Sequence, residues 1–132
     1  MRVCIVDQDV SNAKSTISRL SSPDSHLAVE CNVADWDSQR QAFEQAIKAF
    51  GRIDHVYPIA GIGEKKFMPN DPSNPEFVKP MLSVIDIDLT GVIYTASLAV
   101  QQMRRQEKDG GGFRGKSKFM WHLLLSSVLR CL

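Results

Sequence analysis

The stretch Val3-Cys4-Ile5-Val6-Asp7 is a short apolar run with β-branched residues that ends in an acid. This pattern is typical of a buried strand. Residues 11–20 place apolar side chains at helical spacing, and residues 26–31 form a second short apolar run. A strand, a helix and a second strand in direct succession indicate a parallel α/β sheet with right-handed crossovers. The beginning of the chain therefore already favours the α/β fold class.

The rest of the chain continues this alternation. Asp35 is a good N-cap for an amphipathic helix, and Gly51 stands where such a helix commonly ends. The elements expected after it are a strand at 54–60, a proline-rich loop at 64–80, a long helix at 81–107 and a strand at 119–125. Helical spacing predicts that the long helix buries a stripe that includes Ile85 and Leu89.

The composition is that of an ordinary globular protein. The 132 residues are 43% hydrophobic and 23% charged, which favours one domain spanning 1–132. Sixteen basic residues against fifteen acidic ones leave a net charge of +1, which argues against a nucleic-acid binder and against disorder. No uninterrupted apolar run reaches the about 18 residues of a membrane span. Three cysteines without a Cys-x-x-Cys pair indicate reduced thiols, no metal site and a cytoplasmic location.

Three polar or small positions follow the three predicted strands, at the edge where open α/β sheets bind ligands. Asp7 is placed to accept the ribose hydroxyls of an adenosine and to repel a 2′-phosphate, so it favours NAD over NADP. It is equally well placed as a turn or N-cap acid, as is Asp9. Asn32 either reads an adenine edge or makes a turn. Ala60-Gly61 either lets a ligand approach the backbone or makes a tight turn.

One glycine pattern does not support a phosphate site. Gly110, Gly112 and Gly115 satisfy G-x-G-x-x-G. That motif has its meaning only between a strand and a helix. Here it follows the charged end of the predicted helix and leads into a predicted strand, so we interpret it as a loop.

Five short segments together resemble the short-chain dehydrogenase/reductase family, a Rossmann-fold group of NAD(P)-dependent oxidoreductases. In chain order they are Val3–Asp7, Cys31-Asn32-Val33, Phe50–Val56, Pro58–Gly61 and Ile87–Val92. The match is most similar to fungal members related to 15-hydroxyprostaglandin dehydrogenase. It implies an incomplete Rossmann-like parallel sheet made of the family's second to fifth strands. The cofactor-binding residues that the resemblance implies are Asp7, Asn32, Val33, Ala60 and Gly61.

The chain also departs from the family's pattern. The family's first strand and its Gly-rich turn precede the second strand, where this sequence begins. The family's catalytic Tyr-x-x-x-Lys is missing, because the only tyrosines are Tyr57 and Tyr94 and the residues four positions later are Gly61 and Leu98. That tyrosine acts as the acid/base toward the substrate oxygen. We therefore expect weak NAD binding and no catalysis by these residues alone.

Two further positions correspond to catalytic residues of the family. Asp88 stands where the family has the asparagine that anchors a water relay. Ser127, within Leu125-Ser126-Ser127-Val128, resembles the serine that helps to bind the substrate oxygen. Segment 113–132 is open to two interpretations, since it is either the family's fifth strand or a tail unrelated to the family.

The resemblance predicts a fragment of an oxidoreductase that transfers hydride between NAD(P) and an alcohol or ketone, with the helix at 81–107 as an oligomer interface. The alternative is a non-enzymatic remnant that binds a partner through sheet edges or this helix. A distant alternative is a phosphoacceptor receiver domain, which requires an aspartate at the end of the third strand, whereas Asp54 starts that strand. In the Rossmann order the missing strand lies between the first and third strands of this chain. We therefore expect those two either to pair directly or to leave a gap.

Overall fold

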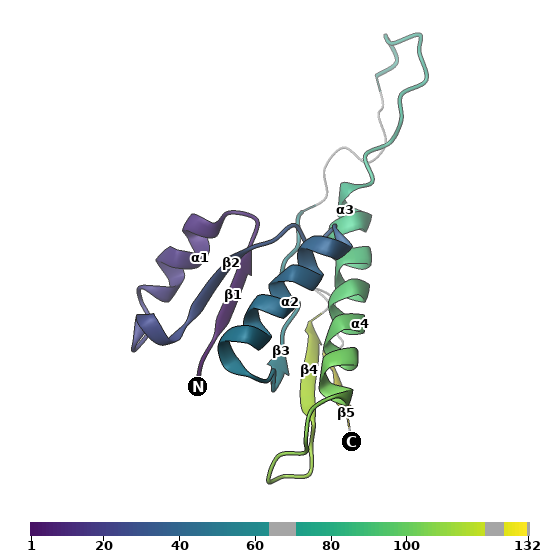
Figure 1. Cartoon of the computed structure of the whole chain (residues 1–132). Coiled ribbons are helices and arrows are strands. Elements are labelled where there is room, and N and C mark those ends of the chain that lie inside the picture. The colour runs from purple at the N-terminus through teal and green to yellow at the C-terminus, as the bar shows by residue number, and fades with distance from the viewer. Residues whose placement is uncertain (64–70, 121–125, 132) are drawn as a thin grey trace.

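The structure is a computed structural model and describes residues 1–63, 71–120 and 126–131. Helices and strands alternate along the chain as the sequence predicts, and the chain ends in two strands (Figure 1). This confirms the α/β class. In chain order the elements are β1 (Cys4–Asp7), α1 (Val10–Ile17), η1 (Pro23–Ser25), β2 (Leu27–Glu30), α2 (Trp36–Phe50), β3 (His55–Val56), α3 (Ser83–Ile85), η2 (Asp86–Thr90), α4 (Gly91–Arg104), β4 (Gly115–Met120) and β5 (Ser126–Cys131).

The first sheet consists of β1 and β2, which pair in parallel over their full length. A side chain supplements this ladder at its start: the N–H of Val3 donates to Nδ1 of His26 over 3.1 Å. The carbonyl of Val3 accepts the N–H of Leu27 over 2.9 Å. Helix α1 packs against both strands and buries Ala13 and Ile17. This strand–helix–strand unit agrees closely with its sequence pattern.

The second sheet has the order β3-β4-β5. Strand β3 is only two residues long and pairs in parallel with β4, and β5 runs back antiparallel along β4. The predicted strands at 54–60 and 119–125 were therefore misplaced in extent, and the antiparallel β5 was not foreseen. Residues 121–125 lie outside the described part. The physical signal for β4 is alternation: Gly115 and Ser117 are buried, while Lys118 points to solvent.

No pairing joins β1 to β3 among the described residues, so the two sheets are separated by a gap. The sequence predicted either this gap or direct pairing, and the gap is what the structure shows. Apolar side chains on both sides are open to solvent: Val6 of β1 is 39% exposed, and Tyr57 and Ile59 after β3 are 56% and 70% exposed. The facing edges of β1 and β3 are thus unpaired strand edges.

Helix α2 begins and ends where the sequence predicts. Oδ1 of Asp35 accepts the N–H of Ser38 over 2.6 Å, and Gly51 ends the helix in the left-handed conformation at φ 81°. The N-terminal segment of the chain contacts the end of this helix: Arg2 donates to the carbonyl of Phe50 over 2.8 Å and lies over the Phe50 ring. Both capping predictions are confirmed.

The long helix from α3 through α4 contains a π-helical turn, η2. It buries Leu98, Ala99 and Met103, but Ile85 and Leu89 are each 42% exposed. The prediction that these two residues are buried was wrong. A π-helical turn has more residues per turn than an α-helix, so side chains before and after it do not share one face. Among the described residues, it is α4 that packs against α2 and β4.

By length and composition alone, the stretch Ser83–Arg104 is also long and apolar enough to cross a membrane. The core helix of a globular protein meets the same criterion, and here the helix contacts α2, β4 and β5. The absence of a membrane span therefore stays a prediction from the sequence.

Candidate functional site

The residues that the sequence singled out lie at or after the carboxyl ends of β1, β2 and β3. We call Asp7, Asn32, Val33, Ala60 and Gly61 the rim. The N–H of Cys31 donates to the carbonyl of Asp7 over 2.9 Å, so the backbone places Asn32 next to the end of β1. The structure thus brings the first two rim segments together across the β1–β2 ladder.

Asp7 and Asp9 have different roles. Oδ1 of Asp9 accepts the N–H of Ser11 over 2.9 Å, which makes Asp9 the N-cap of α1. Hydrogen bonds from the Ser11 hydroxyl and N–H lower the pKa of Asp9. Asp7 is exposed, and its Oδ1 accepts the N–H of Asp9 over 2.9 Å. Its Oδ2 has no protein partner in the described residues. Asp7 therefore combines a turn role with one available carboxylate oxygen.

Asn32 shows the same division. Its Oδ1 accepts the N–H of Ala34 over 3.0 Å, so the turn role considered from sequence is real. Its own N–H donates to the hydroxyl of Ser38 over 3.0 Å. The side chain is exposed, and Nδ2 has no protein partner within the described ranges. An amide donor is therefore available next to the end of β1.

Val33 is held on one side only. Its carbonyl accepts from Nε2 of Gln39 over 2.7 Å, whereas its N–H makes no hydrogen bond to any described residue. The main chain at Val33 also touches α4: a Cβ on Gly91 would lie 2.9 Å from the Val33 carbonyl oxygen. Gly91 is therefore required by this close approach.

The third rim segment contacts the π-helical turn of the long helix. Oδ1 of Asp88 accepts the N–H of Ile62 over 3.0 Å. A Cβ on Gly61 would come within 3.3 Å of the same oxygen. Ala60 and Gly61 are exposed, and Asp88 is half-buried. The carboxylate of Asp88 therefore holds the backbone that follows β3.

Ser127 is placed here by its backbone only. It lies near the start of β5, opposite Phe119 near the end of β4. Since β4 runs parallel to β3, this point lies toward the carboxyl edge of the second sheet. Its strand is antiparallel to β4, however, so it is not the parallel strand end that the resemblance implied. The role of Ser127 stays a prediction.

The glycine pattern at 110–115 lies between a helix and a strand, as the sequence analysis inferred. Oδ1 of Asp109 accepts the N–H groups of Gly111 and Phe113, each over 2.9 Å. Backbone hydrogen bonds from Phe113 and then Gly111 lower the pKa of Asp109, although desolvation opposes them. The carboxylate thus organises a turn between α4 and β4, and the predicted loop is confirmed.

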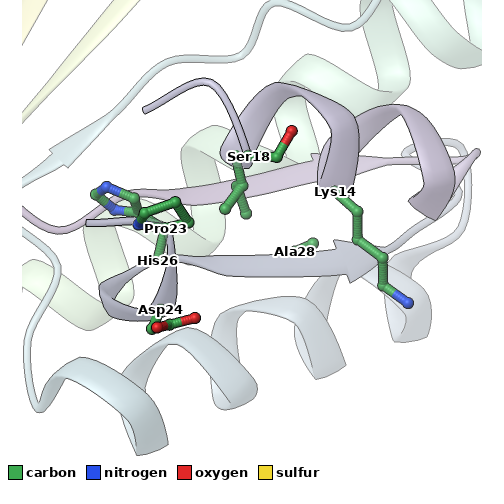
Figure 2. Close-up of a pocket in the computed structure, with 7 residues that line it drawn as sticks. Lys14, Ser18, Pro23, Asp24, His26 and Ala28 are labelled. Carbon is green, nitrogen blue, oxygen red and sulfur yellow. The ribbon is translucent and has the colours of Figure 1, made fainter. Parts of the chain in front are cut away.

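Two hollows lie away from the rim. Figure 2 shows the larger, of about 380 Å³, whose lining side chains come from α1, η1 and the start of β2. His26 contributes to it, but both of its ring nitrogens are engaged, one by the N–H of Val3 and one by the carbonyl of Ser21. The smaller hollow, of about 210 Å³, lies between α2 and α4. Neither contains a rim residue.

The cysteines do not point to metal or redox chemistry in the part of the chain that the structure describes. Burial, and secondarily the nearby Cys31, raises the pKa of Cys4 from 9.0 to about 11. Burial also raises the pKa of Cys31. Reactive or ligating cysteines have lowered pKa values. No group of three His, Cys, Asp or Glu in the described ranges is arranged to hold a metal ion, and the absence of a metal site stays a prediction.

The sequence analysis overlooked Gln39, which is 3% exposed and contacts both Val33 and α4. A signal was present. Trp36, Gln39 and Phe43 recur at helical spacing, so a polar side chain stands within the apolar stripe of the predicted helix. A polar residue at such a position requires buried partners.

Residues 1–112 match the model of the short chain dehydrogenase family. The chain is 32% identical over 108 residues to the short-chain dehydrogenase/reductase ascJ of Acremonium egyptiacum, which covers 76% of this chain and 36% of that protein. It is 33% identical over 85 residues to (-)-trans-carveol dehydrogenase of Rhodococcus erythropolis, which covers 64% of this chain and 29% of that protein.

Solved structures show the same fold over most of this chain. A 3-ketoacyl-(acyl-carrier-protein) reductase from Brucella melitensis complexed with NADH matches with a TM-score of 0.61 at 25% identity, over 76% of this chain and 39% of that one. An NADPH-dependent 3-quinuclidinone reductase from Rhodotorula rubra matches with a TM-score of 0.66 at 20% identity, over 88% of this chain and 41% of that one. The chain therefore has an incomplete Rossmann-like fold and spans well under half the length of these relatives. The finer resemblance to 15-hydroxyprostaglandin dehydrogenase-like members stays a prediction.

Proposed function

The chain belongs to the short-chain dehydrogenase/reductase family of oxidoreductases, and on that premise we propose that it forms the adenosine-binding part of a nicotinamide-dependent enzyme for alcohols or ketones. The observation that carries the proposal is the placement of Asp7 and Asn32 at neighbouring strand ends, where the N–H of Cys31 donates to the carbonyl of Asp7. Asp7 is the last residue of β1 and Asn32 lies two residues after the parallel strand β2, and each keeps one polar atom without a protein partner in the described residues. Such strand ends are the ligand-binding edge of open α/β sheets.

The rim residues fit the adenosine half of a nicotinamide dinucleotide. Oδ2 of Asp7 is an acceptor for ribose hydroxyls, and Nδ2 of Asn32 is a donor to an adenine nitrogen. The N–H of Val33 is a further donor, and Ala60-Gly61 present little side chain to a ligand. A carboxylate repels a 2′-phosphate, so we assign NAD over NADP. When bound, the cofactor supplies the hydride chemistry.

The residues proposed for catalysis have narrower roles. An ionised aspartate only accepts hydrogen bonds, and Oδ1 of Asp88 already accepts the N–H of Ile62. We assign Asp88 to positioning the backbone after β3 rather than to proton transfer. Ser127 is the candidate partner of a substrate oxygen. The 132 residues contain no Tyr-x-x-x-Lys, so as an isolated polypeptide they are proposed to be inactive. The free thiols of Cys4 and Cys31 support a cytoplasmic location.

The test is a titration of the isotope-labelled 132-residue chain with NAD, followed by amide shifts. We expect shifts at Asp7 and Asn32 with an affinity weaker than low micromolar, and weaker shifts with NADP. Asp7→Ala should abolish binding and Asn32→Ala should weaken it. Asp24→Ala removes an exposed acid from η1, away from the rim, and should leave binding unchanged. An unaltered affinity in Asp7→Ala contradicts the proposal.

A second candidate is association through the long helix. Three apolar side chains before, within and after the π-helical turn are exposed to solvent: Ile85, Leu89 and Ile93 are 42%, 42% and 56% exposed. Together with the unpaired edges of β1 and β3, these exposed apolar side chains support an oligomer or a partner-binding role. Sedimentation at increasing concentration should show a dimer that Leu89→Lys dissociates, and a concentration-independent monomer argues against it. Family membership argues against the receiver-domain alternative.

A further inference from the structure

Gln39 is a buried polar residue whose hydrogen-bonding groups are all engaged. It is 3% exposed. Its Nε2 donates to the carbonyls of Val33 and Gly91 over 2.7 and 2.9 Å. Its Oε1 accepts from the hydroxyl of Thr95 over 2.8 Å. A buried amide with this many partners is held in one orientation.

The three partners connect parts of the chain that the sheets leave unconnected. Val33 belongs to the segment after β2, in the first sheet's half of the molecule, whereas Gly91 and Thr95 belong to α4, which packs on the second sheet. Gly91 allows the two backbones to touch, because a Cβ there would meet the Val33 carbonyl at 2.9 Å. The side chain of Gln39 thus fixes the Val33 peptide against α4.

This contact bears directly on the rim. The Val33 carbonyl that Gln39 holds lies in the peptide unit directly after the one that carries the Val33 N–H. That N–H and Nδ2 of Asn32 are donors left without protein partners among the described residues. The orientation of donors before ligand arrival decides how much binding free energy is lost to ordering them. A residue that fixes the Val33 carbonyl therefore influences how the neighbouring donors are oriented, without touching the ligand.

We infer that Gln39 is a positioning residue that sets the Asn32–Val33 segment for recognition of the adenine ring. This inference rests on the proposed cofactor function. Gln39 holds the carbonyl of Val33 toward α4, and the adjoining donors of Asn32 and Val33 are kept at the rim.

The experiment compares the two buried glutamines of the chain. Gln106 is 7% exposed and ties Ile53 and Arg114 to the end of α4, at the opposite end of the helix from Gly91. Gln39→Met and Gln106→Met each remove a buried amide of similar shape, and only the first is next to the rim. The probe is adenosine monophosphate, titrated into the labelled 132-residue chain.

We expect Gln39→Met to weaken the affinity measured at the Asn32 and Val33 amides about tenfold. A loss of this size corresponds to roughly one hydrogen bond to the ligand that is no longer well oriented. Gln106→Met should keep the affinity. Thr95→Val, which leaves both Nε2 contacts in place, should lose about two- to threefold and serves if Gln39→Met does not fold. Equal losses in the two methionine variants, or none in Gln39→Met and Thr95→Val, overturn the inference.

If the wild-type chain shows no shift with the probe, the proposed function fails and the positioning role is still measured without ligand. Amide exchange at Ala34 and Asp35, whose N–H groups bond to Asn32, should then be faster in Gln39→Met than in Gln106→Met. Unchanged exchange at these two amides overturns the positioning role by itself.

Discussion

The β1–β2 sheet and the β3–β4–β5 sheet differ in how their parallel pairing is secured. β1 and β2 pair over four residues each, around a short helix in the same stretch of chain. β3 gives only two residues to β4, which arrives after the long loop and the long helix. Contacts close in sequence form at a lower entropic cost than distant ones. The proposed adenosine-binding side of the molecule therefore forms its parallel pairing at a lower entropic cost than the side expected to carry chemistry.

The two halves are joined by helices rather than by strands. No ladder connects β1 to β3 in the described residues, while α2 packs against both β2 and α4. Trp36 of α2 and Tyr94 of α4 meet edge to face at 5.3 Å between ring centroids. The predictions that follow test how far the two halves behave differently.

The largest expected effect is complete absence of turnover. The second half lacks a tyrosine with a lysine four residues on, and general acid–base catalysis by such a group is typically worth about 10²–10⁴-fold. The purified 132-residue chain should therefore not reduce NAD with any secondary alcohol. Production of NADH above the protein-free background, followed by absorbance, contradicts this prediction and would give the second half a chemistry not visible in its sequence.

The next effect concerns the unpaired edges between the halves. Unpaired strand edges with exposed apolar side chains tend to pair with other chains, and apolar surface left in water adds nothing to an ordinary domain's stability of about 5–15 kcal/mol. The isolated chain should therefore melt below about 65 °C or aggregate, since mesophilic domains melt near about 45–65 °C. A soluble monomer with a cooperative transition above about 65 °C by calorimetry would show that the gap is harmless.

A smaller effect comes from the contact between the halves. Gly91→Ala places a methyl group 2.9 Å from the Val33 carbonyl oxygen, so α4 and the segment after β2 must move apart. We expect a loss of about 1–3 kcal/mol in the free energy of unfolding, measured by urea titration. The matched control is Gly63→Ala, where nothing lies within 4 Å of the added Cβ, and the change should stay within about 0.5 kcal/mol. Equal changes in the two variants would show that the contact between Gly91 and Val33 does not contribute to stability.

The smallest effect is an alkaline weakening of the first half. Burial, and then Cys31, raises the pKa of Cys4 from 9.0 to about 11. A thiol with a higher pKa when folded stabilises the protein fully below pH 9.0 and loses that contribution as the pH rises toward about 11. The urea midpoint should fall over this range, and fall less in Cys4→Ala. Parallel curves for the two proteins would assign the alkaline loss to other groups.

Local signals in the sequence predicted the first half well and the second half partly. Asp35 and Gly51 act as caps as expected, because a cap depends on its own backbone and its near neighbours. The short β3 and the exposed Ile85 and Leu89 were not foreseen. The extent of β3 depends on a partner strand far along the chain, and η2 carries Asp88, whose hydrogen-bond partner Ile62 lies 26 residues earlier. Neither leaves a periodic signal in sequence.

The candidate site was also predicted only in part from the sequence. The positions of Asp7, Asn32 and Gly61 at strand ends follow from strand order alone. The sharing of the turn role between Asp7 and Asp9 could not be decided from residue type, because both are aspartates next to a helix start. Gln39 lies far in sequence from Gly91 and Thr95, so its partners became visible only in three dimensions.

The edge-to-face contact between Trp36 and Tyr94 has an optical consequence. The two rings belong to α2 and α4, so the indole reports on the distance between the two halves. The other tryptophan, Trp121, lies outside the described residues, and Trp121→Phe would leave Trp36 as the sole indole emitter. Its emission wavelength and its quenching by iodide then distinguish separation of the halves from unfolding within either one. The fluorescence of Trp36 therefore reports on the contact between α2 and α4.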